Sequence, residues 1–259
     1  MAGELKIDAR RKKILELLRR DGQVRVTQLS EQLGATPVTI RSDLDSLEQD
    51  GYLERTQGGA IQTTKNYYNM EFQRRKQEHM HLKKAIAAYA AGMVRDGNTL
   101  FINSGTTTYF TAIELKKRKN LNIVTNSISV AVELGDVPTF RVILLGGEIN
   151  AQYSFTYGEA AREQLSRFKA DYAILSIDGV SPQAGLTTYH AEESVIDRIM
   201  MERAQRTMVV ADSTKLNHES FSHVSDLSDI VCWITDEKAD RALTERITQK
   251  GVEVHFAKS

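Results

Sequence analysis

The chain has 259 residues, of which 26% are charged, and its 34 Lys and Arg residues balance its 34 Asp and Glu residues. This length suits two domains, and neither a signal-peptide pattern nor an apolar run of membrane-spanning length is present, so we expect a cytoplasmic protein without a membrane partner. The single cysteine, Cys232, lies in an apolar run and is interpreted as a core residue.

The first predicted elements are two helices separated by a short connection. Residues 10–20 form a basic amphipathic pattern with Ile14, Leu15, Leu17 and Leu18 on its inner side. A shorter helix is expected over residues 27–33, and Gly34 closes it. The turn over residues 34–36 then leads to a third helix, which is the spacing of a helix-turn-helix.

The third helix has the pattern of a helix that enters DNA. Thr36 is a suitable N-cap, and Pro37 suits the first helical position because its missing N–H has no partner there. Ile40, Leu44 and Leu47 recur at the spacing of one buried stripe, which turns Arg41, Thr39, Ser42 and Asp45 outward. An arginine and short polar side chains on the leading turn suit contacts with base edges and phosphates.

A β-wing is predicted after this helix. Gly51 is expected to end the helix, and strands over 53–56 and 60–63 flank the turn at 57–59. An ordinary helix followed by a hairpin would give the same pattern. The predicted DNA-binding residues are Arg25, Thr36, Pro37, Thr39, Arg41, Ser42, Arg55, Gln57, Gly58 and Gly59.

Charge alone does not support DNA binding. Residues 1–60 hold ten Lys and Arg residues and ten Asp and Glu residues, so the prediction rests on how the side chains are arranged. The run over residues 61–84 is basic. We interpret it as a linker and a solvated helix face, with contacts to the DNA backbone as the alternative.

The remainder alternates between apolar runs and helical patterns. A helix is expected over 71–93, with Ile86, Tyr89, Ala90 and Met93 on one face. Strands are expected at 99–102, 122–124, 142–145, 172–177, 208–211, 230–234 and 252–256, and helices at 107–117, 127–134, 160–168, 193–204 and 238–250. This alternation predicts an α/β, Rossmann-like domain whose mainly parallel sheet is covered on both faces.

Polar or glycine-bearing segments follow six of these strands. They are Asn103-Ser104-Gly105, Thr125-Asn126, Gly146-Gly147-Glu148, Asp178-Gly179, Asp212-Ser213 and Thr235-Asp236. Each alone is an ordinary turn. Because ligands bind at the carboxyl ends of strands in open α/β sheets, we expect the six segments together to line one crevice.

The segment from Ser104 to Thr108 is the most specific part of this crevice. Free N–H groups at a helix start, with several hydroxyl groups beside them, suit a phosphate, although the same loop could simply cap the helix. The predicted effector-binding residues are Asn103, Ser104, Gly105, Thr106, Thr107, Asn126, Gly146, Gly147, Glu148, Asp178, Glu192 and Lys215. Glu193, His190, Tyr153 and Tyr157 are further candidates. His190 has no second ligand at metal-binding spacing, so no metal or cofactor is expected.

At this point a family resemblance covers nearly the whole chain. Residues 8–63 resemble the winged helix-turn-helix of the DeoR family of bacterial transcription regulators, through Arg11, Ile14 and Leu18, the run Thr39-Ile40-Arg41-Ser42-Asp43-Leu44, Gly51, and Gly58-Gly59-Ala60. The second half matches that family's effector domain at Ser104-Gly105-Thr106-Thr107, Thr125-Asn126-Ser127, Leu145-Gly146-Gly147, Tyr157-Gly158, Asp178-Gly179, Gly185-Leu186-Thr187 and Ala211-Asp212-Ser213-Thr214-Lys215.

The resemblance implies a domain like ribose-5-phosphate isomerase that binds a phosphorylated sugar or sugar-like metabolite. Two positions depart from the family pattern. Ser42 stands where a second basic residue is usual, and Asn103 stands where an aspartate is usual.

These observations predict a DNA-binding domain at 1–63, a linker and the start of a connecting helix at 64–80, and an effector domain at 81–259. The favoured function is a ligand-modulated transcriptional regulator, a repressor of carbohydrate uptake or catabolism genes, and not an enzyme. The alternative is a sugar-phosphate isomerase with an appended DNA-binding module, in which Asp178 or Glu192 would be the base. Because one winged head gives a small interface, we expect a homo-oligomer, dimer or tetramer, on double-stranded operator DNA.

Overall fold

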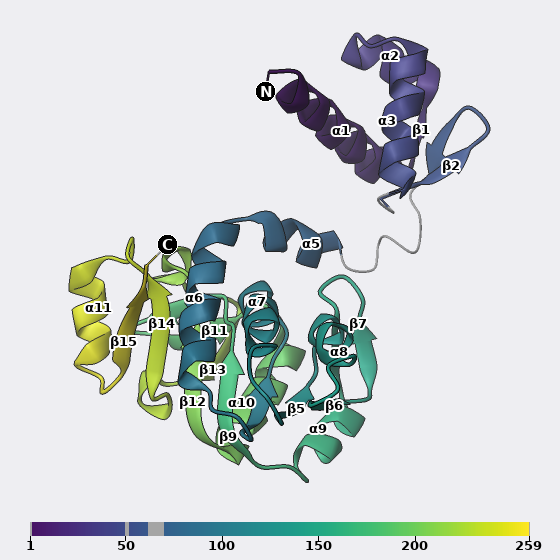
Figure 1. Ribbon diagram of the computed structural model, residues 1–259. Coiled ribbons are helices and arrows are strands. Elements are labelled where there is room, and N and C mark those ends of the chain that lie inside the picture. Colours follow the sequence, from purple (N-terminus) through teal and green to yellow (C-terminus); the bar gives the residue numbers. More distant parts are fainter. Residues whose placement is uncertain (1, 50–51, 62–69, 259) are drawn as a thin grey trace. The chain divides into compact units, whose positions relative to one another are not determined.

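The computed structural model describes residues 2–49, 52–61 and 70–258, and the chain divides into two compact units, Met1–Met70 and Glu71–Ser259 (Figure 1). The second unit begins at Glu71, so residues 71–80 pack with the α/β domain although the sequence pattern assigned them to the connection. Within the described residues, no helix combines the length and apolar character needed to cross a bilayer.

The described residues 2–49 and 52–61 of the first unit form three helices and a small antiparallel sheet. Its elements are α1 (Ala2–Asp21), β1 (Gln23–Arg25), α2 (Val26–Leu33), α3 (Pro37–Gln49), β2 (Glu54–Thr56) and β3 (Gly59–Ile61). The strand order is β1-β3-β2, so the wing has a third strand, β1, that the sequence pattern did not predict. Gly34 ends α2 in the left-handed conformation, as expected.

The start and the inner face of α3 agree with the sequence analysis. The backbone N–H of Thr39 donates to Oγ1 of Thr36 at 3.2 Å, which makes Thr36 the N-cap. Ile40, Leu44 and Leu47 are buried against the hydrophobic core that α1 and α2 complete. The predicted helix end at Gly51 and the strand residues 62–63 lie outside the described part of the chain.

The wing depends on one close backbone approach. Gly59 pairs with Arg25 across β1 and β3, and a Cβ atom at position 59 would lie 2.0 Å from the carbonyl oxygen of Val24. Any side chain at this position would therefore push β1 away from β3.

The second unit is built around a seven-stranded sheet in which every neighbouring pair is parallel. The strand order is β15-β14-β12-β9-β4-β5-β6. The strands are β4 (Thr99–Ile102), β5 (Asn122–Thr125), β6 (Arg141–Leu144), β9 (Ala170–Leu175), β12 (Ala204–Val210), β14 (Cys232–Asp236) and β15 (Glu253–Ala257). All seven predicted strands are present, with bounds that differ by a few residues, and the predicted α/β fold is confirmed.

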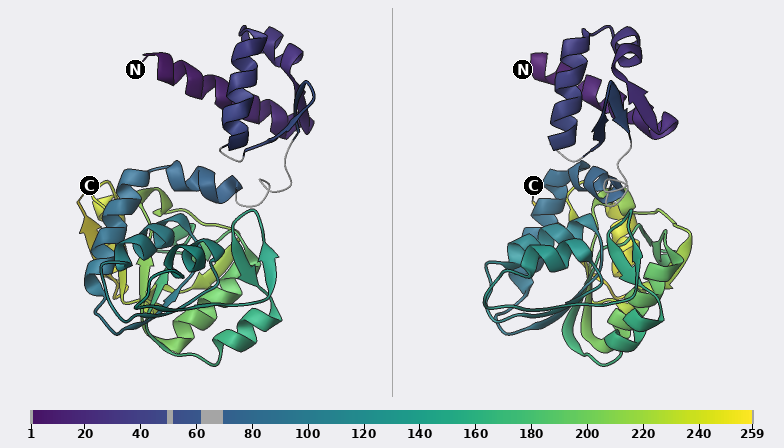
Figure 2. Two further views of the ribbon diagram at one scale, coloured as in Figure 1. Left: turned by 45° about the vertical axis from the view of Figure 1, so that its right-hand side comes forward. Right: turned by 90° about the vertical axis from the view of Figure 1, so that its right-hand side faces the viewer.

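Helices cover both faces of this sheet. Alternate strand residues point to opposite sides, so each face presents apolar side chains to the helices. Leu100 and Ile102 pack with α6 (Met80–Met93), α7 (Thr106–Leu115) and α8 (Ile128–Leu134) on one face. Phe101 packs with α9 (Glu159–Leu165) and α10 (Ala191–Arg203) on the other, where α11 (Arg241–Thr248) also lies. Figure 2 shows these layers within the α/β unit from two further directions.

The predicted continuous helix over 71–93 is wrong. The structure has two helices, α5 (Met70–Gln77) and α6, separated at His79, whose φ of 52° is left-handed. This break turns α5 away from the direction of α6. Tyr89, expected on the buried face, is 40% exposed, while Ile86 and Ala90 are buried.

Two small antiparallel sheets were not predicted. One has the order β10-β11-β13, formed by β10 (Gly179–Ser181), β11 (Gly185–Thr188) and β13 (Ser222–Ser225). The other pairs β7 (Glu148–Asn150) with β8 (Phe155–Tyr157). Two short 3-10 helices, η1 (Ser213–Lys215) and η2 (Leu227–Asp229), complete the unit.

Candidate functional site

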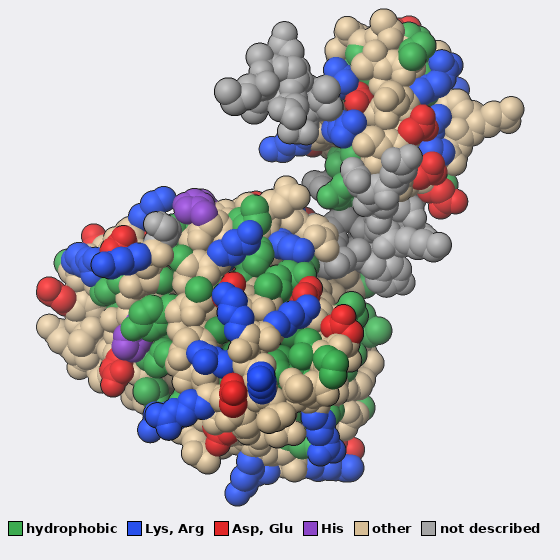
Figure 3. Space-filling model, viewed as in Figure 1, with side chains coloured by type: hydrophobic (Ala, Val, Ile, Leu, Met, Phe, Trp, Pro, Cys, Tyr) green, Lys and Arg blue, Asp and Glu red, His purple; other side chains and the backbone are tan. Residues whose placement is uncertain are grey.

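The first candidate site is the exposed face of α3. Thr36, Pro37, Arg41 and Ser42 are exposed and Thr39 is half-buried, so the predicted recognition residues lie on the side of α3 opposite its core contacts. In the face visible in Figure 3, basic side chains of this unit are interspersed with acidic ones. A broad basic patch is absent from that face, which agrees with recognition by a few placed residues.

An acidic residue holds α1 against α3. Asp43 is 3% exposed and accepts hydrogen bonds from Nε and Nη2 of Arg10 and from Nε of Arg11. Arg11, one of the residues that carried the family resemblance, therefore has a structural partner. The hydrogen bonds and charges of both guanidinium groups offset the unfavourable desolvation free energy of the buried Asp43 carboxylate.

The wing is fixed to α3 by Arg55. Its Nη1 lies 2.6 Å from Oδ1 of Asp45 and donates to the carbonyl oxygen of Arg41 at 3.2 Å. Its backbone N–H also donates to Glu48 at 2.7 Å. Arg55 was predicted to contact DNA, whereas its guanidinium group here contacts α3. Of the other wing candidates, Arg25, Gln57 and Gly58 are exposed and Gly59 is buried.

The second candidate site lies at the carboxyl end of the parallel sheet. From β4 the chain continues to β5 on one side, and after β6 it returns to β9 on the other side of β4. The loops after β4 and β9 therefore diverge, which is where open α/β sheets bind ligands. A cavity at this point is lined by Phe72, Arg75, Ser104, Gly105, Thr106, Tyr153, Ser176, Ile177, Asp178, Thr188 and Glu193.

An ion pair crosses this cavity. Nη2 of Arg75, on α5, donates to Oδ1 of Asp178 at 2.6 Å, and Nζ of Lys215 lies 3.8 Å from the same oxygen. Burial alone would raise the pKa of Asp178, but the charges of Arg75 and Lys215 outweigh burial and lower it. Asp178 is therefore a carboxylate at neutral pH, and it also accepts from the backbone N–H of Tyr189.

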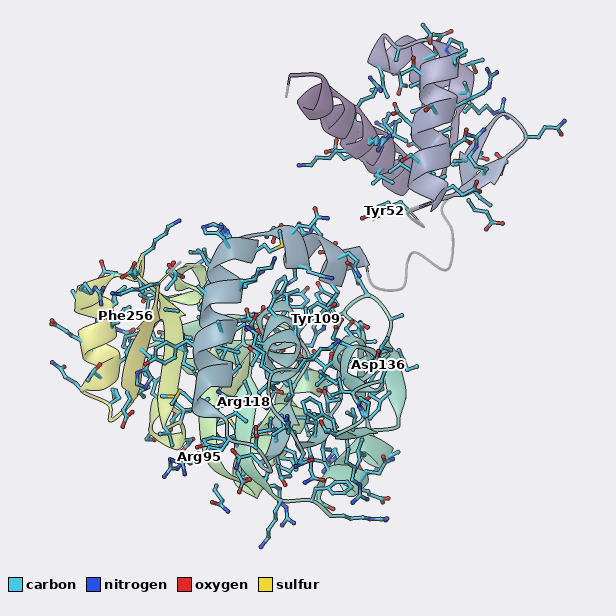
Figure 4. All side chains as sticks on the ribbon, in the orientation of Figure 1. Tyr52, Arg95, Tyr109, Arg118, Asp136 and Phe256 are labelled. Carbon is cyan, nitrogen blue, oxygen red and sulfur yellow. The ribbon has the colours of Figure 1, made fainter. Side chains whose placement is uncertain are left out.

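Helix α5 lies against α7 as well as against the cavity. The rings of Phe72 and Tyr109 meet edge to face with centroids 5.6 Å apart, and Nζ of Lys76 lies 4.5 Å from the Tyr109 ring centroid. Tyr109, labelled in Figure 4, lies on α7 beneath α5. These contacts hold α5 where Arg75 reaches Asp178.

A second, cationic pocket adjoins the first and shares four lining residues with it: Arg75, Thr106, Ser176 and Ile177. It adds the side chains of Lys83, Lys215 and His79 to the first turn of α7. Two acids, Glu78 and Asp212, also line this pocket, where they face the three cations Arg75, Lys83 and Lys215. Lys83 is only 5% exposed and donates to the carbonyl oxygen of Arg75. Burial lowers the pKa of Lys83 to about 8, so the charged form of Lys83 predominates at pH 7.

Gly105 lets the loop after β4 approach the loop after β9. Its φ is 151°, and a Cβ atom there would lie 2.6 Å from Cβ of Ser176. With glycine, the first N–H groups of α7 lie at the edge of both pockets. This arrangement places a helix N-terminus beside Lys83 and Lys215, which is a suitable environment for an anion.

The buried carboxyl group of Glu193 lines the cavity, and the buried carboxyl group of Asp197 lies close to it. Glu193 accepts a hydrogen bond from Oγ of Ser104 and another from Oγ1 of Thr188 at 3.3 Å. Burial raises the pKa of Glu193 to about 7 and raises that of Asp197 well above its usual range. Protons are therefore held in this cluster near neutral pH.

Asn103 does not line the cavity. Its Nδ2 donates to the carbonyl oxygen of Ser176 and to Oδ1 of Asp197, both at 2.9 Å, and its Oδ1 accepts from the backbone N–H of Ser176. The amide therefore joins the ends of β4 and β9. An ionised aspartate, the residue expected here from the family pattern, could donate neither of these two bonds.

The structure brings together half of the predicted effector residues. Ser104, Gly105, Thr106, Thr107, Asp178 and Lys215 line the two pockets. Glu192 is exposed, and its neighbour Glu193 faces the cavity instead.

Four further predicted residues lie away from both pockets, so the prediction of one crevice with six strand ends is wrong. Asn126 is buried and donates to Thr156, and Gly146, Gly147 and Glu148 lie at the β6 edge of the sheet.

Arg75, Lys83 and Ser176 were not proposed as site residues. Arg75 sits in a basic run that is typical of a solvated helix face, so its position gave no separate signal. Lys83 precedes Ile86 and Ala90 at the spacing of one buried helix face, and that phase could have indicated a buried lysine.

Comparisons with known proteins agree with this architecture. A family model described as the DeoR-like helix-turn-helix domain matches residues 10–66, and one described as the DeoR C terminal sensor domain matches residues 78–237. The HTH-type transcriptional repressor CsqR of Escherichia coli (strain K12) is 30% identical over 251 residues, covering 97% of this chain and 96% of that protein. The chain belongs to the DeoR family.

Other similar proteins include the glycerol-3-phosphate regulon repressor of Escherichia coli (strain K12), which is 30% identical over 94% of this chain and 96% of its own length. Among solved structures, ribose 5-phosphate isomerase A from Methanocaldococcus jannaschii matches 54% of this chain and 55% of its own, at a TM-score of 0.40 and 16% identity. This DeoR-family protein is a DNA-binding transcriptional regulator with a sensor domain.

Proposed function

We propose that this DeoR-family regulator represses a carbohydrate operon and that a phosphorylated sugar or sugar-like metabolite, bound at the carboxyl end of the parallel sheet, alters its affinity for operator DNA. The observation that carries this proposal is the pairing of two different pockets. One gathers Lys83 and Lys215 at the start of α7, and the other presents Asp178, Ser104 and Glu193.

The two pockets suit the two ends of such a ligand. A phosphate fits the cationic pocket, because lysine ammonium groups and free N–H groups at a helix start both favour an anion. Sugar hydroxyl groups fit beside Asp178, since a carboxylate accepts their hydrogen bonds. Tyr153 lines the first pocket, and its ring lies 4.3 Å by centroid from the ring of the half-buried His190.

The isomerase alternative is not favoured by the same geometry. A base must be free to remove a proton from carbon, and Asp178 is paired with Arg75 at 2.6 Å. The charges that lower its pKa also make it a weaker base. Glu192, the other candidate base, is exposed and lies outside both pockets.

Helix α5 gives the ligand a direct contact with the start of the second unit. A phosphate beside Lys83 and Lys215 would compete with Asp178 for Arg75, and with the Arg75 carbonyl oxygen for Lys83. Among the described residues, α5 is the first helix after the wing strand β3. We infer that ligand binding repositions α5 and that the operator affinity changes because bound and free states hold α5 differently.

The experiment that tests this proposal uses the full chain. Thermal unfolding is followed with pentose phosphates, hexose phosphates and glycerol phosphate, with the unphosphorylated compounds and inorganic phosphate as controls. A ligand at a hundredfold excess over its Kd should stabilise the second unit by about 2.7 kcal/mol. Lys215→Ala should abolish this stabilisation, whereas Lys169→Ala, an exposed lysine just before β9, should leave it unchanged.

Two outcomes would contradict the proposal. Stabilisation by none of the phosphorylated compounds would remove the sensor role assigned to these pockets. Turnover of a sugar phosphate that disappears in Asp178→Asn would instead favour the isomerase.

We also propose that the regulator binds DNA as a homo-oligomer. One winged head presents a small interface, and specific operators usually combine two half-sites that match a symmetric protein. Sedimentation of the full chain at micromolar concentration should give a dimer or tetramer, and a monomer both with and without DNA would exclude this assembly.

A further inference from the structure

The exposed face of α3 carries an apolar side chain at its centre. Val38, the second residue of α3, is 72% exposed, whereas Ile40, Leu44 and Leu47 are buried. Successive residues of an α-helix are about 100° apart, so Val38 lies nearly opposite the middle of that buried stripe. An isolated exposed valine is ordinary on a protein surface, so what distinguishes Val38 is its position on the helix that reads DNA.

The neighbours of Val38 complete a small recognition surface. Arg41 and Ser42 follow it by three and four residues, which places them beside it on the same face, and both are exposed. Asp45 lies one turn further on, and its carboxylate is paired with Arg55 at 2.6 Å. The negative charge closest to this surface along α3 is therefore neutralised by the wing. An apolar side chain, a cation and a hydroxyl group remain.

We infer that Val38 reads a thymine in the major groove through the C5-methyl group of that base. Among the four bases, only thymine presents a methyl group in the major groove, and apolar side chains recognise that methyl group by van der Waals contact. The first turn of a recognition helix is the part that reaches the base edges. Valine suits this task because its branched side chain is nearly fixed in one rotamer in a helix.

The position of Arg41 extends this inference to the order of bases. Arginine most often reads guanine in the major groove, through two parallel hydrogen bonds. Since Val38 and Arg41 are one turn apart on α3, the thymine lies within a few base pairs of the base that Arg41 contacts. Each operator half-site therefore contains one thymine whose methyl group contributes to affinity.

The test measures the methyl group directly. The full chain is used to select its preferred sequence from randomised double-stranded DNA, and each thymine in that sequence is then replaced by deoxyuridine, which lacks only the methyl group. Affinities are measured by fluorescence anisotropy at one fixed salt concentration. In each half-site, replacement of one particular thymine should weaken binding about fourfold. This factor corresponds to the free energy of burying one methyl-sized group.

The same replacement series is repeated with Val38→Ala. This variant keeps the helix, because alanine has the higher helix propensity. We expect the sensitive thymine to lose its effect in Val38→Ala, while Val132→Ala, a valine on α8 that is 75% exposed, keeps the wild-type pattern.

Three results would overturn the inference: no sensitive thymine in the wild type, a sensitive thymine that persists in Val38→Ala, or equal weakening of every sequence by that substitution. Failure to select any DNA would instead count against DNA recognition by α3 as a whole.

Discussion

Both units contain an aspartate paired with arginine, and the two pairs differ in what surrounds them. In the DNA-binding unit, Asp43 is buried between α1 and α3 and accepts from Arg10 and Arg11. In the α/β unit, Asp178 pairs with Arg75 inside a cavity that other polar side chains line. The first pair fixes the packing of two helices, whereas we propose that the second is exchanged for contacts with a ligand.

The largest expected effect is a pH dependence of stability, and it comes from the buried acid Glu193 near the Arg75–Asp178 pair. Burial raises the pKa of Glu193 to about 7, above the usual value of 4.5, so the native state holds a proton that the unfolded chain releases between these pH values. This contribution to the stability of the α/β unit should therefore be complete below pH 4.5 and fall by about 2.4 kcal/mol between pH 5 and pH 7.5. Thermal unfolding across this range measures the change.

Glu193→Gln is the matched control for this pH dependence. The variant cannot titrate, so its stability should change less between pH 5 and pH 7.5. Burial lowers the pKa of His190, which makes its own contribution opposite in sign. Equal slopes for the wild type and Glu193→Gln would show that the buried glutamate is not the titrating group.

The next effect tests the structural pair in the DNA-binding unit. Asp43→Asn leaves Arg10 and Arg11 without their carboxylate and should destabilise the first unit by about 2 kcal/mol, less than a fully buried pair because both arginines are partly exposed. Urea unfolding of the full chain, followed by a probe in the first unit, measures the loss. Asp45→Asn, at an exposed pair, should cost less than about 0.5 kcal/mol.

A smaller effect, on operator affinity, is expected when Arg41 is replaced. Arg41→Ala should weaken operator binding by about 1.5 kcal/mol, roughly tenfold, if Arg41 contacts a base. Anisotropy titrations at fixed salt give this value. Unchanged affinity would place another part of the unit in the groove.

The sequence pattern predicted the parallel sheet well and the small antiparallel sheets poorly. The seven parallel strands are continuous apolar runs because helices cover both their faces. Strands such as Gly179–Ser181 and Gly185–Thr188 have three or four residues and are rich in Gly, Ser and Thr, so they resemble turns. The break at His79 was missed because a single left-handed residue leaves no change in periodicity.

The sequence predicted those parts of the candidate ligand site that have a recognisable local composition. The loop from Ser104 to Thr107 has a recognisable composition, and it lines both pockets. Arg75 could not be separated from Arg74 and Lys76 by sequence, since only the packing of α5 on α7 determines which of the three cations faces Asp178. Asn103 was placed in the crevice by its strand-end position, although its amide is used between β4 and β9.

We propose that ligand binding in the cavity around Asp178 controls the affinity of the DNA-binding unit for operator DNA. The most direct test measures the operator Kd of the full chain with and without the phosphorylated sugar that stabilises it most, for the wild type and for Lys215→Ala. We expect at least a tenfold change of Kd in the wild type, about 1.4 kcal/mol, and no change in Lys215→Ala, with equal affinities in the absence of ligand. A ligand that stabilises the protein but leaves the operator Kd unchanged, or a full response in Lys215→Ala, would contradict this proposal.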